Sequence, residues 1–221
     1  MIGLIRTVFF AIIVRPLLLI ILGLHVRYNY RLPKKGPAVL VANHNSHLDA
    51  LALICLFPLS LLKKIRPIAA QDYFFRNAIL KWFALNVMGI IPIDRKSKSI
   101  RKNPFSGINE SLNNNEIIIL FPEGSRGSPE DLGEFKSGIA HLAKQNPEVP
   151  VIPVFMHGLG KVLPKGEALL VPFFIDIFIG ESLFWNSNKE SFMESLTTNI
   201  CLLYTSPSPR DLSTSRMPSS A

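Results

Sequence analysis

The stretch Asn43-His44-Asn45-Ser46-His47-Leu48-Asp49 decides how this chain folds, because it directly follows the apolar run at 38–42. That run reads AVLVA and lies between a proline and polar residues, which predicts a buried strand. Beyond Asp49 the apolar residues recur with helical spacing, so we expect a helix over 47–57. His44 then lies on a strand-to-helix turn, with Asp49 about one turn into the helix. α/β folds usually place their chemistry at this open end of the sheet.

Strand-like and helix-like segments alternate along the rest of the chain, which predicts an α/β domain. Short apolar runs predict strands at 38–42, 67–70, 89–93, 116–121, 149–155, 168–171 and 174–180. Segments of helical periodicity predict helices at 47–57, 73–87, 100–113, 137–145 and 189–203. We therefore expect a mostly parallel sheet of about seven strands flanked by helices.

The first 30 residues are strongly apolar and predict a membrane-docked helical segment. Residues 7–24 nearly reach the ~20 apolar residues of a membrane span. However, Arg15 lies at their middle, where insertion costs about 3 kcal/mol, and Pro16 would kink a helix. Two short helices that dip into one leaflet, with Arg15 snorkelling, are favoured over a single span. Positive charge at both ends of the segment favours a hairpin that returns to the cytoplasmic face of the membrane, so we expect the following domain on that face.

Three parts follow from these patterns. Residues 1–30 are the membrane-docking helices, and 31–200 form the α/β domain. Residues 201–221 are a tail that is Ser/Pro-rich beyond Tyr204, which predicts disorder. The tail also resembles the translation of a non-native sequencing adapter, so we expect it to take no part in the fold.

The formal net charge of +8 and the 48% hydrophobic content narrow the choice of partner. A basic chain suits nucleic acid, anionic lipid or a phosphorylated substrate. Neither a ladder of aromatic residues among basic ones nor a Cys/His finger spacing occurs, so no nucleic acid is expected. Membrane lipid is the better partner for so apolar a chain. The two cysteines, Cys55 and Cys201, form no disulfide or zinc pattern and suit a reducing compartment.

His44 and Asp49 have the chemistry of a proton-transfer pair. Histidine is well matched to proton transfer near neutral pH, and a carboxylate on its other ring nitrogen would fix the tautomer. The chain has no Gly-x-Ser-x-Gly nucleophile elbow, so the pair suits activation of a hydroxyl on the substrate, as in acyl transfer to an alcohol. A metal site could use His47 as a third ligand beside His44 and Asp49. Such sites usually begin His-x-His, whereas this stretch begins His-x-x-His, so no metal is expected. His47 is expected at the surface near the helix start.

A second group of residues, Phe121-Pro122-Glu123-Gly124-Ser125-Arg126-Gly127, follows the apolar run at 117–120. Its glycines permit a tight turn and a close approach of the backbone to a ligand. The planar fork of Arg126 suits a phosphate, and Glu123 could hold that arginine or accept a bond from a substrate hydroxyl. On its own, such a loop is more often just a turn.

Taken in order, these motifs resemble the glycerolipid acyltransferase family, of the 1-acylglycerol-3-phosphate acyltransferase type. The family's blocks are Asn-His-x4-Asp, Gly-x5-Arg, Phe-Pro-Glu-Gly-(Ser/Thr)-Arg and Val-x-Pro-Val. They appear here at 43–49, 89–95, 121–126 and 151–154.

The resemblance implies transfer of a fatty acyl chain from an acyl thioester, on CoA or acyl carrier protein, to the free hydroxyl of a lysophospholipid, without a cofactor. The most natural acceptor is 1-acylglycerol-3-phosphate, which gives phosphatidic acid. The resemblance makes His44 the general base and Asp49 its orienting partner. It places the acceptor's phosphate near Arg95, Glu123, Gly124, Ser125 and Arg126. Three alternatives remain. The chain could transfer the acyl group to another lyso-lipid, such as a lyso-ornithine lipid. It could also be a non-catalytic membrane-binding relative or a soluble cytoplasmic hydrolase.

Overall fold

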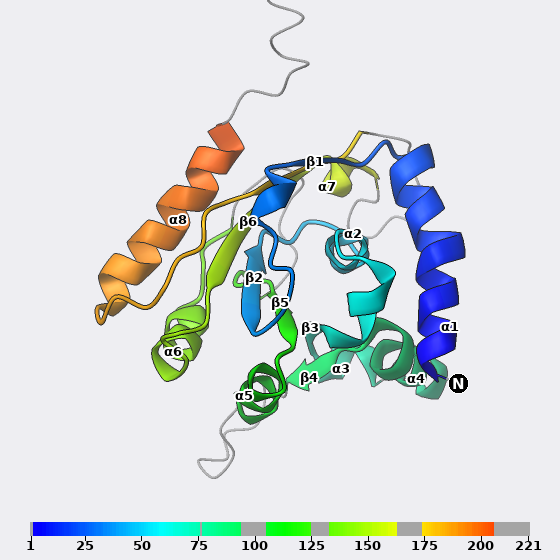
Figure 1. Cartoon of the computed structure of the whole chain (residues 1–221), viewed down its shortest axis with the longest axis horizontal. Helices are drawn as coiled ribbons and strands as arrows, with labels where there is room; N and C mark the ends of the chain where they lie inside the picture. Colours follow the sequence, from blue (N-terminus) through cyan, green and yellow to red (C-terminus); the bar gives the residue numbers. More distant parts are fainter. Residues whose placement is uncertain (1, 76, 94–104, 125–132, 163–173, 206–221) are drawn as a thin grey trace, which may run out of the picture.

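A seven-stranded sheet forms the centre of this computed structural model, which describes residues 2–75, 77–93, 105–124, 133–162 and 174–205 (Figure 1). The strand order is β1-β7-β6-β2-β5-β3-β4, and every neighbouring pair is parallel except β6 and β7. The strands are β1 His25–Arg27, β2 Ala38–Ala42, β3 Ile65–Ala70, β4 Ile91–Ile93, β5 Ile117–Leu120, β6 Val151–His157 and β7 Asp176–Ile179. The expected mostly parallel α/β sheet is confirmed.

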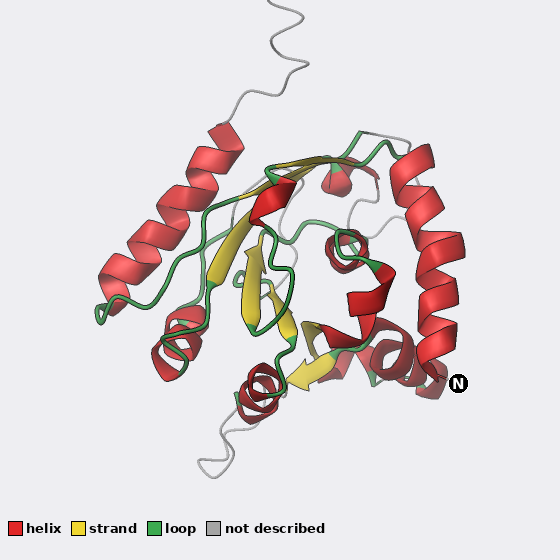
Figure 2. Cartoon of the chain, in the orientation of Figure 1, coloured by secondary structure: helices red, strands yellow, loops and turns green. Residues whose placement is uncertain are grey.

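Helices cover both faces of the sheet (Figure 2). One face packs against α2 Asp49–Cys55 and the N-terminal helix, whereas the other packs against α5 Ser106–Asn113, α6 Gly138–Gln145 and α8 Lys189–Thr205. The remaining helices are short: η3 Asn29–Arg31, η4 Leu59–Lys64, α3 Gln71–Phe74, α4 Ala78–Phe83, η5 Ala84–Met88 and α7 Leu159–Val162.

The central strand β2 explains the three-layer arrangement, because its side chains alternate between two hydrophobic cores. Leu40 belongs to the core under α2 and the N-terminal helix. Val39 and Val41 belong to the core under α5, α6 and α8. All five residues of β2 are buried, as expected for a parallel strand covered on both faces. The apolar run at 38–42 is therefore the centre of the sheet.

Strand β1 was not predicted, since it lies inside the first 30 residues, which the sequence analysis assigned to helices. It has only three residues and pairs with β7, the pairing joining His25 to Asp176. A strand this short carries no alternation that a sequence pattern could reveal. The predicted strand at 168–171, the first residues of the predicted helix at 100–113 and the tail beyond 205 lie outside the described residues.

The N-terminal segment is one continuous helix from Ile2 to Ile21, so the prediction of two short helices was wrong. Its parts are α1 Ile2–Val8, η1 Phe9–Val14 and η2 Leu17–Ile21, and the last two are π-helical. The wider π-type hydrogen bonding on both sides accommodates Pro16, which has no N–H to donate. Among the described residues it is the one helix long and apolar enough to cross a membrane by length and composition.

Both arginines of this helix point toward the domain. Nη2 of Arg6 donates to the carbonyl oxygens of Ile65 and Met88, each at 3.0 Å. Nη2 of Arg15 donates to the carbonyl oxygen of Phe57 at 2.5 Å. Burial lowers the pKa of Arg6 to about 10, so the guanidinium remains charged at neutral pH. The helix thus keeps its charges against the protein and leaves its outer side apolar.

Candidate active site

The two sequence motifs meet because they follow neighbouring parallel strands. β2 and β5 pair in parallel, with Val41 opposite Leu120. The residues after each strand therefore emerge at the same edge of the sheet. Residues 43–49 and residues 121–124 lie side by side there, although about 75 positions separate them in the chain.

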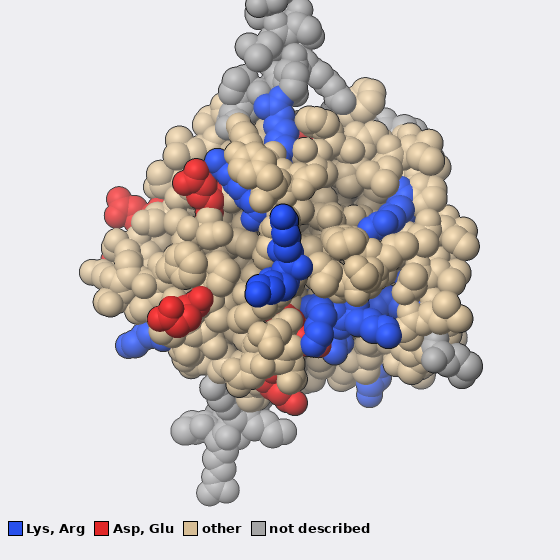
Figure 3. All heavy atoms as spheres, in the orientation of Figure 1, with Lys and Arg blue, Asp and Glu red and all other residues tan. Residues whose placement is uncertain are grey.

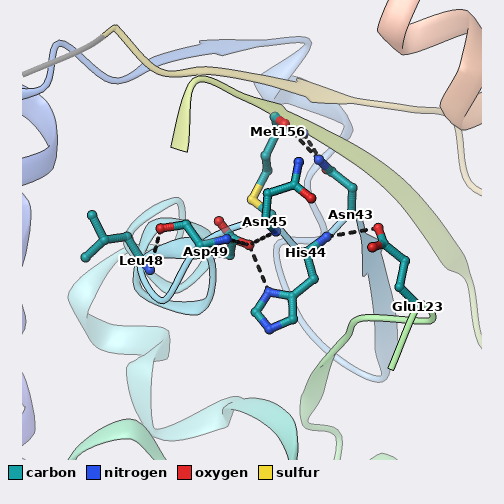
Figure 4. A network of polar contacts seen from close by, with 8 residues as sticks. Asn43, His44, Asn45, Leu48, Asp49, Glu123 and Met156 are labelled. Carbon is teal, nitrogen blue, oxygen red and sulfur yellow. Dashed lines mark hydrogen bonds and ion pairs between the residues drawn. The ribbon is translucent and has the colours of Figure 1, made fainter. Parts of the chain in front are cut away.

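Asn43 fastens the start of the His44 loop to the neighbouring strand β6 (Figure 4). Its Nδ2 donates to the carbonyl oxygen of Met156 at 2.9 Å, and its Oδ1 accepts from the Met156 N–H at 2.8 Å. The side chain is 1% exposed, so both bonds are shielded from water. This paired contact fixes where the chain leaves β2 and hence where His44 begins.

Asp49 organises the loop through a single carboxylate oxygen. Its Oδ2 lies 2.8 Å from Nδ1 of His44, and it also accepts from the backbone N–H groups of Asn45 at 2.7 Å and Ser46 at 2.9 Å (Figure 4). The Asp49 side chain is fully buried as the first residue of α2. A carboxylate held by two backbone donors has little freedom, so it places the proton on Nδ1 and orients the ring. Nε2 is then the nitrogen that can take a proton from a substrate.

An aromatic side chain packs against the imidazole of His44. The imidazole stacks on the ring of Phe121, with ring centroids 4.3 Å apart and an angle of 20° between the planes. The side chain of His44 is 24% exposed, whereas that of Asp49 is 1% exposed. The pair therefore combines a buried carboxylate with a partly exposed imidazole, an arrangement that a general base requires.

Glu123 supports the backbone of the His44 loop. Its Oε1 accepts from the N–H of His44 at 3.1 Å, and the residue is 7% exposed. Burial raises the pKa of Glu123, and the bond from the His44 N–H partly opposes this rise. The observed contact differs from the two expected ones, namely an arginine partner or a substrate hydroxyl. The role of Glu123 near a phosphate stays a prediction.

Gly124 brings a lysine to the site that the sequence analysis missed. Its φ is +74°, and a Cβ at this position would lie 2.7 Å from Nζ of Lys136. The Lys136 N–H also donates to the carbonyl oxygen of Pro122 at 3.0 Å, which closes the loop. A lysine just before the predicted helix at 137–145 was the available signal, but only the folded loop places its ammonium beside Gly124. Arg95, Ser125 and Arg126 lie outside the described residues, so their roles stay predictions.

A cavity of about 660 Å³ opens beside His44. Its polar lining residues include His44, His47, Asp72 and Lys136. Most of the remaining lining is apolar, and it includes Leu51, Ile68, Phe74, Leu80, Phe83, Met88, Ile90, Ile108 and Ile139. This volume is within the range of small-molecule pockets. A mostly apolar cavity with a few polar lining residues suits a molecule with a long hydrocarbon part and a polar end.

His47 lies at the surface, as expected, although it also lines the cavity. Within the described part of the chain, no group of three or more His, Cys, Asp or Glu side chains is arranged to hold a metal ion.

Comparisons with known proteins identify relatives of this chain. The sequence model of the Acyltransferase family matches residues 23–157, more than half of the chain. The chloroplastic 1-acyl-sn-glycerol-3-phosphate acyltransferase of Arabidopsis thaliana is 34% identical over 131 residues, which cover 59% of this chain and 35% of that protein. The mouse 1-acyl-sn-glycerol-3-phosphate acyltransferase alpha is 32% identical over 145 residues, which cover 64% of this chain and 48% of that protein. The chain thus spans between about a third and a half of the length of these relatives.

The fold is also similar to a solved structure. The crystal structure of the 1-acyl-sn-glycerophosphate (LPA) acyltransferase PlsC from Thermotoga maritima matches with a TM-score of 0.63 and 22% identity. The match covers 84% of this chain and 73% of that protein. At this identity the likeness concerns the fold.

Proposed function

Because the chain belongs to the acyltransferase family, we propose that it transfers a fatty acyl chain from an acyl thioester to the free hydroxyl of a lysophospholipid. We propose 1-acylglycerol-3-phosphate as the acceptor and phosphatidic acid as the product, since the relatives carry that activity in their names. The observation that carries the proposal is the 2.8 Å contact between Nδ1 of His44 and Oδ2 of Asp49 at the side of an apolar cavity.

The reaction begins at Nε2 of His44, which takes the proton from the acceptor hydroxyl as that oxygen attacks the thioester carbonyl. A C–O bond forms, and the C–S bond of the thioester breaks. The imidazolium then returns its proton to the leaving thiolate, so the histidine ends as it began. Asp49 stabilises the imidazolium while it exists and holds the ring in the required tautomer. No acyl group is placed on the protein.

The apolar and the basic residues of the site bind different parts of the substrates. The apolar lining holds a fatty acyl chain, and its burial supplies about 0.8 kcal/mol for each CH₂ group removed from water. Lys136, together with Arg95 and Arg126, holds the acceptor phosphate. Binding energy from the phosphate, which lies away from the reacting bond, positions the hydroxyl near His44. The donor is acyl-CoA or acyl carrier protein, and no cofactor takes part.

The apolar helix from Ile2 to Ile21 keeps the protein at a membrane, where its lipid acceptor is found. We place the catalytic domain on the cytoplasmic face, since Arg27, Arg31, Lys34 and Lys35 follow the apolar helix and segments rich in Lys and Arg tend to stay on that face. The two inward-facing arginines support a helix that stays attached to the domain, because a helix crossing the bilayer alone would expose both charges to lipid.

A substrate panel tests the proposal. The purified full chain is given labelled acyl-CoA or labelled acyl carrier protein with lysophosphatidate, lysophosphatidylcholine, lysophosphatidylethanolamine or a lyso-ornithine lipid. We expect lysophosphatidate to be acylated fastest, and His44→Ala to abolish the reaction while the far-UV and near-UV circular dichroism spectra stay unchanged. His141→Ala is the matched control, since His141 is an exposed histidine on α6.

Each outcome of this panel has a clear meaning. Faster turnover of a different lyso-lipid corrects the acceptor. Turnover of none of them by the unaltered chain, with either donor, favours a non-catalytic membrane-binding relative. A well-folded His44→Ala variant with near-normal turnover refutes the mechanism.

A further inference from the structure

Helix α4 carries four large apolar side chains on one broad face, although it is only six residues long. Leu80 and Phe83 line the catalytic cavity. Ile79, four positions before Phe83 and so its neighbour on the helix, is 77% exposed, and Trp82 is 47% exposed. Phe75, just ahead of the helix, is 38% exposed. A surface helix normally turns polar side chains outward, so the outer side of α4 requires an explanation.

The outer side of α4 continues an apolar face of the N-terminal helix. The rings of Phe9 and Phe83 meet edge to face with centroids 5.3 Å apart, and α1 packs against η5, the continuation of α4. Figure 1 shows α1 and α4 at the same corner of the molecule. We define the outer apolar surface as Ile5, Val8, Ile12, Phe75, Ile79 and Trp82, all of which are more than a third exposed.

Two lysines lie beside this surface, one of them over the ring of Phe75. Arg6 lies between these positions in the sequence, but its guanidinium is buried against the domain. Nζ of Lys81 lies 4.5 Å from the ring centroid of Phe75. The Lys63 side chain lies against Gly3 at the start of α1. In Figure 3 one group of basic side chains lies in the lower right of the view, with others at the top, centre and lower left, and the acidic side chains lie mostly on the left.

Protein surfaces that contact a lipid bilayer typically combine apolar residues, a tryptophan and flanking lysines. Exposed apolar patches of this kind mark either a membrane or a protein partner. The bilayer is the better occupant, because the surface is continuous with the apolar N-terminal helix and the chain carries a formal net charge of +8. Anionic headgroups complement the lysines at the edge.

We propose that the outer side of α4 is a second membrane-contacting surface, and that the apolar face of α4 leads from the bilayer to the catalytic cavity. The proposal rests on the proposed function, since a lipid acceptor gives the cavity a reason to lie there. Helix α4 is about 10 Å across with its side chains. An acceptor that passes beside it from the bilayer to His44 therefore crosses the width of one helix and never enters bulk water.

The chain offers its own probe, since Trp82 and Trp185 are its two tryptophans. Trp185→Phe leaves Trp82 as the sole tryptophan, and Trp82→Phe leaves Trp185, which packs against Phe192 beside α8. Each variant is mixed with vesicles of phosphatidylethanolamine and phosphatidylglycerol, with and without brominated acyl chains. We expect Trp82 fluorescence to shift to shorter wavelength and to be quenched by brominated lipid, and Trp185 fluorescence to change little. A vesicle-bound protein in which Trp82 stays unquenched overturns the proposal, and so does a chain that does not bind vesicles.

A charge on the outer side tests the functional consequence. Ile79→Asp should weaken vesicle binding at least about tenfold, since it puts a charge into the lipid interface. It should also slow turnover of vesicle-embedded lysophospholipid while leaving turnover of a short-chain, water-soluble acceptor nearly unchanged. Leu202→Asp, at a 61% exposed leucine on α8, is the matched control and should alter neither.

Failure of this inference differs from failure of the proposed function. If Ile79→Asp acts like the unaltered enzyme on vesicles, the surface assignment is wrong while the acyltransferase stands. If the unaltered chain acylates no lyso-lipid, the proposed function is wrong whatever the fluorescence shows.

Discussion

Replacing Asp49 by Asn removes one negative charge from the site and leaves the shape of the side chain. The amide oxygen of Asn can still accept from the N–H groups of Asn45 and Ser46, which now donate to Oδ2 of Asp49 at 2.7 and 2.9 Å. It can also accept from Nδ1 of His44, so the ring keeps its orientation and tautomer. The amide nitrogen takes the place of Oδ1, a buried atom without a hydrogen-bond partner in the described structure. We expect the free energy of unfolding to fall by about 1–3 kcal/mol, the usual cost of an unpaired buried donor.

The catalytic loss follows from the electrostatics of the imidazolium. With Nδ1 and Oδ2 2.8 Å apart, the two charge centres lie roughly 4 Å apart. Two unit charges at ~4 Å attract by about 4 kcal/mol at an effective dielectric constant of about 20. Losing that attraction when the histidine takes its proton should lower kcat by about a thousandfold, since each ~1.4 kcal/mol is a factor of ten in rate.

The assay follows product formed from labelled acyl-CoA and lysophosphatidate, at a temperature well below the melting point of the variant. Asp176→Asn is the matched control, because Asp176 is another buried aspartate paired with a histidine, at 3.2 Å from Nδ1 of His25. We expect that control to stay within about threefold of the unaltered rate. Because Asp49 acts through His44, adding Asp49→Asn to His44→Ala should cause no further loss. A folded Asp49→Asn variant that retains more than about a tenth of the rate would refute the argument.

Three further variants or treatments test other parts of the structure. Gly89→Ala should lower the free energy of unfolding by about 1–3 kcal/mol, measured by denaturant titration, because Gly89 has a φ of +70° and a Cβ there would lie 2.6 Å from Nη1 of Arg6. Burial raises the pKa of Glu123 above the ordinary glutamate value of 4.5, so the folded state holds the proton more tightly than the unfolded chain does. The unaltered protein should therefore lose stability relative to Glu123→Gln as the pH rises above 4.5. In the native protein at pH 8, iodoacetamide should label Cys201 quickly and Cys55 slowly, because Cys201 is exposed and burial raises the pKa of Cys55 to about 11.

Each of these predictions has its own control. Gly107→Ala, in helix α5, should not destabilise, because its Cβ would make an ordinary 3.5 Å contact with Ile91. For Glu123, stability is compared at pH 4 and pH 7, and an unchanged difference between the two proteins contradicts the assignment. For the thiols, unfolding in denaturant should make Cys55 as reactive as Cys201, and equal native rates would contradict its burial.

Strand β2 and the following turn could be predicted from sequence because their signals are local. Five consecutive apolar residues can be buried on both faces only at the centre of a covered sheet. The sequence placed Asp49 about one turn inside helix α2, whereas the structure makes it the first residue of that helix. This position lets the carboxylate reach back to two backbone N–H groups and to His44. Local periodicity located the helix, but its start depended on those contacts.

The sequence alone determined the α/β class, the order of strands β2 to β7 along the chain, and the pairing of His44 with Asp49, because each depends on residues close together in the chain. The tertiary structure decided which distant residues join that pair. The parallel pairing of β2 with β5 brings Glu123 under the backbone of His44, and the turn at Gly124 brings Lys136 beside it. It also decided that Arg6 and Arg15 face the domain, since the carbonyl groups that receive them come from segments 40 or more residues away. Contacts over such separations depend on how strands and helices pack, and no local pattern of residues records that.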